Sequence, residues 1–132
     1  MSQFQFSLDL KSGVPVYRQI IDQVLVARAA GRLESGDRLP TVRQVAVDLS
    51  INLNTVLRAY KELEIRGILT TQQGSGTFIT AEPPPQDDLE RGRRLQQLAT
   101  DFISRAASEG YRLDELVDVL QERIAGSKNS KK

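Results

Sequence analysis

The chain opens with a pattern of apolar residues typical of an amphipathic helix over residues 16–30, directly after Pro15 and before Gly31. The apolar face consists of Tyr17, Ile20, Ile21, Val24 and Leu25. Proline fits the first turn of a helix, and glycine commonly ends one. We therefore expect a first helix between these two residues, followed by a turn-rich connector over residues 33–40.

Two shorter amphipathic stretches follow, and a tight turn at residues 50–52 separates them. Thr41 is the expected N-cap of the first, and Asn52 or Asn54 that of the second, because their side chains can accept hydrogen bonds from free backbone N–H groups. The apolar face of the first consists of Val42, Val45, Ala46 and Leu49. That of the second consists of Val56, Ala59, Tyr60 and Leu63. Gly67 ends the second helix.

Residues 68–71 and 77–80 are rich in residues that favour strands, and the loop between them, residues 72–76, carries two glycines. This pattern predicts a β hairpin. Three helices followed by a hairpin form the layout of a winged helix-turn-helix, in which the hairpin is the wing. The predicted fold class is therefore mainly α with a small β hairpin.

Three consecutive prolines at residues 83–85 interrupt the chain, since they can continue neither a helix nor a sheet. The sequence thus divides into a winged helix-turn-helix domain of residues 1–80 and a proline-rich linker of residues 81–88. A helical part of residues 89–126 and a disordered, lysine-rich tail of residues 127–132 follow.

Residues 89–126 carry two apolar stripes at helical spacing, and Gly110 separates them. The pattern predicts a helical hairpin that is too small to bury both stripes by itself. A second copy of the chain would cover them and form a two-fold homodimer. The residues that we expect at this interface are Leu95, Leu98, Phe102, Ile103, Leu116 and Leu120.

Composition excludes several kinds of chemistry. The chain contains neither cysteine nor histidine, which removes disulfides, the usual zinc ligands and the commonest general base. It also lacks a nucleophile–base pair and a phosphate-binding loop. No signal peptide or membrane-spanning run is evident. We therefore expect a cytoplasmic protein that is not an enzyme and has no metal, cofactor or membrane contact.

Charge alone does not identify a partner, because the formal net charge is only +1. Residues 1–80 are mildly basic, with nine basic and seven acidic side chains, and residues 81–132 are mildly acidic, with nine and ten. The argument for nucleic acid therefore rests on the helix-turn-helix pattern. In that motif the second helix lies in the major groove of duplex DNA, and its first turns reach the base edges.

The exposed positions of the predicted motif carry side chains suited to DNA. Asparagine and threonine can bond bases, arginine and lysine can meet phosphates, and glycines let the wing backbone approach a strand closely. The predicted DNA-binding residues are Arg43, Asn52, Asn54, Thr55, Arg58, Lys61, Gly74 and Gly76. Simpler interpretations exist for most of them. The arginines and the lysine could be solvated charges on the helix surface, Asn52 could be only a helix cap, and the two glycines could be only hairpin turn residues.

A winged helix that binds protein instead of DNA is the alternative interpretation. The apolar residues Leu53, Leu57 and Ile65 are expected to be exposed and keep this alternative open. A salt titration separates the two, because binding through phosphates weakens steeply as the salt concentration rises.

Several segments, in unbroken order over residues 14–80, resemble the GntR family of bacterial regulators. These segments are residues 15–20 (PVYRQI), 36–43 (GDRLPTVR), 52–64 (NLNTVLRAYKELE), 66–69 (RGIL) and 74–78 (GSGTF). The short C-terminal part resembles the YtrA branch, which lacks the large effector domain of other members. Leu53 departs from the family pattern, since branch members often have proline there and other members arginine.

The resemblance implies a transcription regulator, by default a repressor, that binds an operator of two inverted half-sites as a homodimer. It places the family's DNA contacts on Arg43, Asn52, Asn54, Thr55, Arg58 and the wing glycine Gly74 or Gly76. The sequence names neither the operator nor a small-molecule effector. The C-terminal part is too small for a deep pocket of its own, so an effector would bind at the subunit interface.

Overall fold

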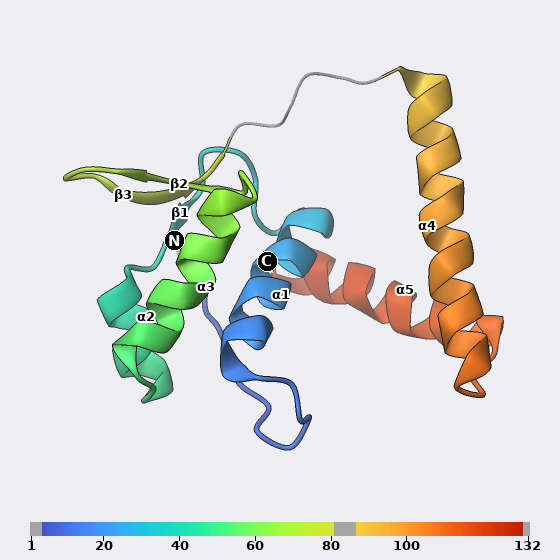
Figure 1. The fold of residues 1–132 in the computed structure, drawn as a ribbon, viewed down its shortest axis with the longest axis horizontal. Coiled ribbons are helices and arrows are strands. Elements are labelled where there is room, and N and C mark those ends of the chain that lie inside the picture. The colour runs from blue at the N-terminus through green and yellow to red at the C-terminus, as the bar shows by residue number, and fades with distance from the viewer. Residues whose placement is uncertain (1–3, 81–86, 131–132) are drawn as a thin grey trace. The chain divides into compact units, whose positions relative to one another are not determined.

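The computed structural model describes residues 4–80 and 87–130, and it describes side chains as far as residue 124. The chain forms two compact units, residues 1–82 and 83–132. The first unit contains α1 (Val16–Ala29), β1 (Arg38–Leu39), α2 (Val42–Leu49), α3 (Leu53–Ile65), β2 (Leu69–Gln72) and β3 (Gly76–Ile79) (Figure 1). The second contains α4 (Asp88–Ser108) and α5 (Leu113–Ser130). The predicted fold class, mainly helical with a small sheet, is confirmed.

The core of the first unit lies where α1, α2 and α3 meet the sheet. The predicted inner face of α3 is buried in full, and on α2 Val45 is buried while its three apolar neighbours are half-buried against the core. The buried core consists of Ile20, Ile21, Val24, Ala27, Leu33, Leu39, Val45, Val56, Ala59, Tyr60, Leu63, Leu69 and Ile79. Burial of these inner faces leaves the opposite side of α3 at the surface.

Side chains cap the two short helices as the sequence predicts. Thr41 Oγ1 accepts a hydrogen bond of 3.1 Å from the backbone N–H of Gln44. Of the two candidates for the cap of α3, Asn52 holds the position, and its Oδ1 accepts a bond of 2.7 Å from the N–H of Asn54. Pro15 is the N-cap of α1 and not a residue of its first turn.

The sheet has three antiparallel strands in the order β1-β3-β2, where the sequence predicted two. β2 and β3 form the hairpin and are each offset by one residue from the predicted strands. β1 lies in the predicted turn-rich connector, and Arg38 pairs with Phe78 of β3. This strand has only two residues and its partner lies far along the chain, so no local pattern indicates it.

The residues before α1 add a layer that the sequence analysis did not predict. Phe4 and Phe6 are half-buried against the core, and their rings meet edge to face with centroids 4.9 Å apart. The side chain of Gln23 on α1 accepts from the N–H of Ser7 at 3.0 Å and donates to its carbonyl at 2.6 Å. The Gln23 side chain therefore pairs with the backbone N–H and carbonyl of Ser7, as the backbone of a neighbouring strand would, and fixes this segment against α1.

The second unit differs from the prediction at both ends. α4 begins at Asp88, inside the predicted linker, because Asp87 caps it by accepting from the N–H of Leu89 at 3.0 Å. Residues 81–86 of that linker lie outside the described residues. α5 continues through the predicted tail as far as Ser130. A single glycine, here Gly126, weakens a helix by about 1 kcal/mol but does not by itself end it.

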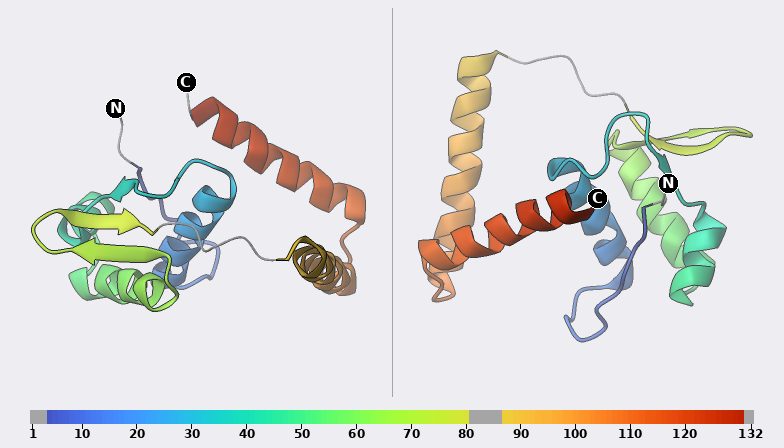
Figure 2. Two further views of the ribbon diagram at one scale, coloured as in Figure 1. Left: turned by 90° about the horizontal axis from the view of Figure 1, so that it is seen from above. Right: turned by 180° about the vertical axis from the view of Figure 1, so that it is seen from behind.

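The helices α4 and α5 meet at the turn that joins them and then diverge (Figure 2). They do not lie side by side along their length, as the predicted helical hairpin would. Within one copy, therefore, the two helices cover each other's apolar stripes only near the turn, where Ala106 is buried and Ile103 and Leu116 are half-buried. No helix in the described part of the chain is both long and apolar enough to span a bilayer.

Candidate nucleic-acid interface

The turn between α2 and α3 is closed by hydrogen bonds at the end of α2. Ser50 adopts the left-handed conformation, with φ 54° and ψ 48°. Its N–H donates to the carbonyl of Val47 at 3.2 Å, and the N–H of Ile51 donates to that of Ala46 at 3.0 Å. This pair of bonds is the Schellman motif, which ends a helix abruptly. Because Asn52 then caps α3, the two helices form a helix-turn-helix with only residues 50–52 between them.

The outer face of α3 carries polar side chains close to its start. Asn54, Arg58 and Lys61 are exposed and Thr55 is half-buried, while Arg43 is exposed at the start of α2. The cap residue Asn52 is exposed as well. All the helical residues predicted to bind DNA are therefore at least partly accessible around the helix-turn-helix. Their accessibility allows contact with a ligand but does not identify the ligand.

Arg58 is attached to α1 by a contact that the sequence did not predict. Its guanidinium carbon lies 3.7 Å from the centroid of the Tyr17 ring. An arginine over an aromatic face is attracted by the ring's quadrupole. The contact exists only because α1 packs against α3, so the spacing of residues within either helix does not indicate it. Arg58 remains exposed and can still turn toward a ligand.

Tyr60 joins α3 to the segment that leads into α2. Its buried hydroxyl donates a hydrogen bond of 2.6 Å to the carbonyl of Pro40, which is also buried. Burial raises the pKa of Tyr60 well above the ordinary value for tyrosine, because the charged phenolate would lose its hydration. The hydroxyl therefore stays protonated and holds the start of α2 close to α3.

The β2–β3 hairpin, the wing, projects beyond the helices (Figures 1 and 2). Gly74 lies in its loop with φ 81°, and a Cβ there would meet nothing within 4 Å. Gly76 has φ 124°, and a Cβ there would lie 2.9 Å from Nε of Arg38. Gly76 therefore makes room for the Arg38 side chain in addition to forming the hairpin.

Arg38 is a candidate site residue that the sequence analysis missed. It is exposed on β1, and its side chain lies against the wing at Gly76. The sequence offers one signal, a basic residue directly before the buried Leu39, as expected for the outward position of a strand. Its position beside the wing becomes evident only when β1 pairs with β3.

A hydrogen bond links the wing to α3, and a second contact lies within the wing. Thr71 Oγ1 donates to Oε2 of Glu64 at 3.1 Å, and the hydroxyls of Thr71 and Thr77 lie 3.5 Å apart. A hollow lies between the start of α2, the outer face of α3 and the two wing strands. Its lining consists of Val42, Asn54, Leu57, Arg58, Tyr60, Lys61, Glu64, Thr71 and Thr77. The wing and α3 thus form one continuous surface.

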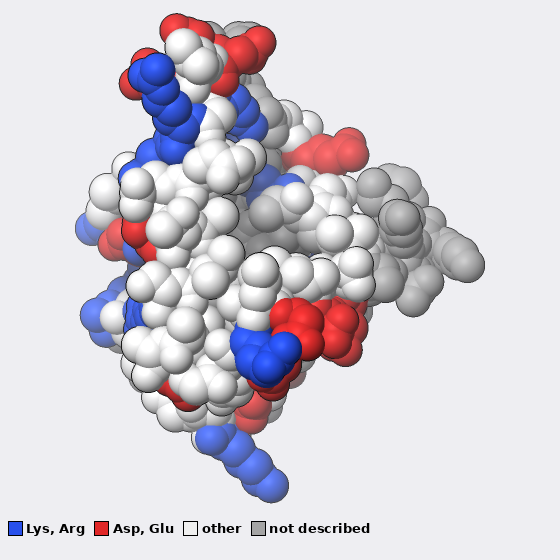
Figure 3. Space-filling view, turned by 90° about the vertical axis from the view of Figure 1, so that its right-hand side faces the viewer, with Lys and Arg blue, Asp and Glu red and all other residues white. Residues whose placement is uncertain are grey.

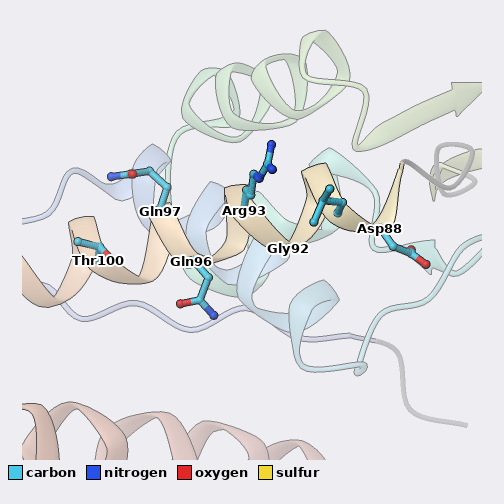
Figure 4. Close-up of a pocket in the computed structure, with 7 residues that line it drawn as sticks. Asp88, Gly92, Arg93, Gln96, Gln97 and Thr100 are labelled. Atoms are coloured by element: carbon cyan, nitrogen blue, oxygen red, sulfur yellow. The ribbon is translucent and has the colours of Figure 1, made fainter.

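Neither the distribution of charge nor the hollow along α4 indicates a second site in the described part of the chain. Acidic and basic side chains form separate small groups on the largely uncharged surface in Figure 3. A hollow along α4 is lined by residues of that helix alone, among them Arg93 and Gln96 (Figure 4). It therefore lacks the facing wall of a small-molecule pocket. The described residues contain no group of three or more His, Cys, Asp and Glu side chains that could hold a metal ion.

A capped helix exposed after a tight turn, beside a β hairpin on a three-helix core, defines the winged helix-turn-helix class of DNA-binding proteins. Residues 16–79 match the model of the bacterial regulatory proteins of the gntR family. The HTH-type transcriptional repressor YtrA of Bacillus subtilis (strain 168) is 37% identical over 127 residues, which cover 95% of this chain and 96% of that protein. The chain belongs to the GntR family.

Two solved structures are similar to most of this chain. YtrA from Sulfolobus acidocaldarius, a GntR-family transcription factor, is 30% identical with a TM-score of 0.57, covering 78% of this chain and 97% of that one. A transcriptional antiterminator from Listeria monocytogenes EGD-e is 26% identical with a TM-score of 0.68, covering 93% and 95%. The predicted YtrA-type membership is confirmed, and the chain is a DNA-binding transcription regulator.

Proposed function

We propose that the chain represses transcription in the cytoplasm by binding an operator in double-stranded DNA as a homodimer. α3 lies in the major groove and the wing lies along the neighbouring backbone or minor groove. The observation that carries this proposal is the arrangement of α3. Its apolar face is buried while Asn54, Arg58 and Lys61 are exposed, and all three line the hollow between α3 and the wing.

Each candidate residue has a role that follows from its place. Asn54 and Thr55 lie in the first turn of α3, where side chains reach base edges, and Lys61 lies further along, within reach of phosphate. Arg43 lies in the first turn of α2, whose free N–H groups also favour an anion. Asn52 acts first as a cap, and its amide nitrogen remains able to donate to DNA.

The wing and the aromatic contact complete the proposed interface. Gly74 leaves open space at the tip of the wing, and Gly76 places Arg38 beside it as a further cation for phosphate. Arg58 contacts DNA from its position over Tyr17, which restricts its side chain before binding. Restriction of this kind lowers the entropy that the side chain loses when the complex forms.

The proposed dimer rests on the apolar stripes of α4 and α5. Leu95, Leu98, Phe102 and Leu120 are exposed, while Ile103 and Leu116 are half-buried. Contiguous apolar surface of this kind marks an interface, and a second copy offers the matching surface. A two-fold dimer would present two copies of α3, so the operator would contain two inverted half-sites. An effector, if one exists, would bind where the two copies meet.

We infer neither a catalytic step nor a cofactor, because the relatives are transcription regulators. The central test is DNA binding itself. Duplexes that bind the protein are selected from a random pool, and their affinity is measured by fluorescence anisotropy between about 50 and 200 mM salt. We expect selection of an inverted repeat and an affinity that falls steeply with salt. Failure to enrich any sequence, with salt-independent binding to a protein instead, would favour the protein-binding alternative.

Arg43→Ala tests the contact assigned to α2. We expect weaker operator binding and a salt slope reduced by about one, because one phosphate contact is lost. The matched control is Arg18→Ala, which removes an exposed α1 arginine that already pairs with Asp22 at 3.9 Å. If Arg43→Ala binds with the affinity of the unmodified protein, the assignment is wrong.

A further inference from the structure

Two leucines lie on the outer side of α3. Leu53 and Leu57 are one helical turn apart and are 37% and 46% exposed. The inner face of the same helix is already complete, with Val56, Ala59 and Leu63 fully buried. The two leucines are therefore available for contact with a partner in addition to whatever packing they provide.

Leu57 lies in a hollow that belongs to the proposed DNA interface. It lines the hollow between α2, α3 and the wing, together with Asn54, Lys61 and Thr71. Three charged side chains, those of Arg58, Lys61 and Glu64, line the hollow together with amide and hydroxyl groups and the apolar surface of Leu57, Val42 and Tyr60. The core of a protein-binding interface is instead depleted of charged residues.

The neighbouring arginine is directed elsewhere. Arg58 lies at the edge of the same hollow, but its guanidinium stacks on Tyr17 of α1. Leu57 follows Asn54 by three residues, so the two lie on the same side of α3, and both line the hollow. A base pair opposite this part of α3 would meet an amide and an apolar group side by side.

Major-groove chemistry identifies the base feature that suits this pair. Each base pair presents a distinct pattern there, and thymine alone presents a methyl group, at C5. Asparagine can form two hydrogen bonds with adenine. A leucine packed on a hydrogen-bonding base edge would instead leave polar atoms without partners. An A·T pair offers both complementary surfaces to Asn54 and Leu57.

We propose that Leu57, with Leu53 one turn before it, reads the C5 methyl groups of thymine, so that each operator half-site contains A·T pairs where α3 lies in the groove. This inference rests on the proposed function, namely that α3 binds in the major groove. It deepens that function by naming the chemical class of base pair that α3 recognises.

The test removes single methyl groups from the DNA. Each thymine of the selected half-site is replaced in turn by deoxyuridine, which pairs like thymine but lacks the C5 methyl. At one or two positions we expect binding to weaken by about fourfold, the equivalent of about one buried methyl group. Affinity is measured by fluorescence anisotropy at fixed salt.

A double-mutant cycle assigns each methyl to a leucine. In Leu57→Ala the penalty at one of these positions should disappear, because the methyl no longer has a partner. The matched control is Ile65→Ala, which truncates an exposed apolar residue at the far end of α3 and should keep every penalty. Circular dichroism melting curves confirm that both variants are folded.

The outcomes separate this inference from the proposed function. If the protein binds its operator but no deoxyuridine substitution weakens binding, thymine recognition is refuted and DNA binding stands. Penalties that persist unchanged in Leu57→Ala and in Leu53→Ala refute the role of these leucines. If the protein selects no DNA at all, the proposed function fails and the inference fails with it.

Discussion

At the scale of single residues, two side chains that are buried or half-buried position the groups at the surface. Tyr17 supports Arg58 from α1, and Tyr60 ties α3 to Pro40. Neither tyrosine needs to touch DNA in order to affect binding. Substitution of such residues should change the geometry or the stability of the interface while its charges remain in place.

Tyr60→Phe removes one hydroxyl from the core and leaves the carbonyl of Pro40 without its partner. We expect a loss of about 1–3 kcal/mol in the free energy of unfolding at pH 7, because a buried acceptor then lacks a hydrogen bond. Urea unfolding measures this loss. Leu63→Ala, which leaves a cavity in the same core, provides a reference of about 2–5 kcal/mol.

The same variant tests the raised pKa of Tyr60. The folded state keeps this phenol protonated, whereas in the unfolded state it ionises at about pH 10. The stability that it contributes is therefore fully present below about pH 10 and is lost as the pH rises further. Since Tyr60→Phe lacks this dependence, its deficit relative to the unmodified protein should shrink at about pH 10.5. An equal deficit at both pH values would contradict the raised pKa.

Gly76→Ala tests the arrangement of Arg38. An alanine at φ 124° is strained, by about 1–3 kcal/mol, and its Cβ would displace the Arg38 side chain. We expect lower stability in urea and weaker operator binding. Gly13→Ala is the matched control, because it also strains the backbone, at φ 79°, but meets no neighbour and lies outside the proposed interface. If both variants lose the same affinity, Arg38 has no part in binding.

At the scale of elements, α1, α2, α3 and α4 all end in the same hydrogen-bond pattern. Three of them place a glycine in the left-handed position, at Gly31, Gly67 and Gly110. α2 places Ser50 there, at the turn of the helix-turn-helix. A non-glycine residue in this conformation costs about 1 kcal/mol. The turn therefore contains modest strain that a glycine would relieve.

Ser50→Gly should raise the free energy of unfolding by about 0.5–1 kcal/mol, because glycine adopts the left-handed conformation without a Cβ clash. Urea unfolding measures the gain. Ser35→Gly serves as the control, since Ser35 is exposed but has no positive φ, and it should give no gain. A Ser50→Gly variant that is less stable than the unmodified protein would show that the serine makes a compensating interaction.

The helices could be predicted from the sequence because their spacing and caps are local signals. Thr41 and Asn52 mark the starts of α2 and α3, and Gly67 marks the end of α3. Each of these signals lies within a few residues of the apolar positions of its helix. β1 could not be predicted in this way, since Arg38 pairs with a strand about forty residues later. The same limit explains why the contacts of Arg38 with Gly76 and of Arg58 with Tyr17 were missed. Both join residues from elements that are distant in sequence.

At the scale of the whole molecule, the C-terminal helices leave their apolar stripes exposed. Phe102 is 49% exposed near the middle of the α4 stripe. Phe102→Asp should separate the proposed dimer, because a carboxylate would be buried against apolar side chains. Analytical ultracentrifugation measures the molecular mass. Thr100→Asp, an exposed polar position on the same helix, is the charge-matched control and should leave the dimer intact.

The same two variants can also be tested for DNA binding. A chain that no longer forms pairs should bind an isolated half-site as before but lose the extra affinity of the full inverted repeat. An unchanged mass for Phe102→Asp would refute the assigned interface. An unchanged mass combined with weakened DNA binding would place Phe102 at a different contact.

The divergence of α4 from α5 also has a consequence for gene control. Helices whose apolar sides are covered only by another copy have a stability that depends on protein concentration. In the proposed assembly, when the protein concentration is well below the dissociation constant of the dimer, the number of dimers would increase with the square of the number of chains. Promoter occupancy would then respond more steeply to synthesis and degradation of the regulator than it would for a monomer. A small change in expression could therefore switch the target genes without any added signal molecule.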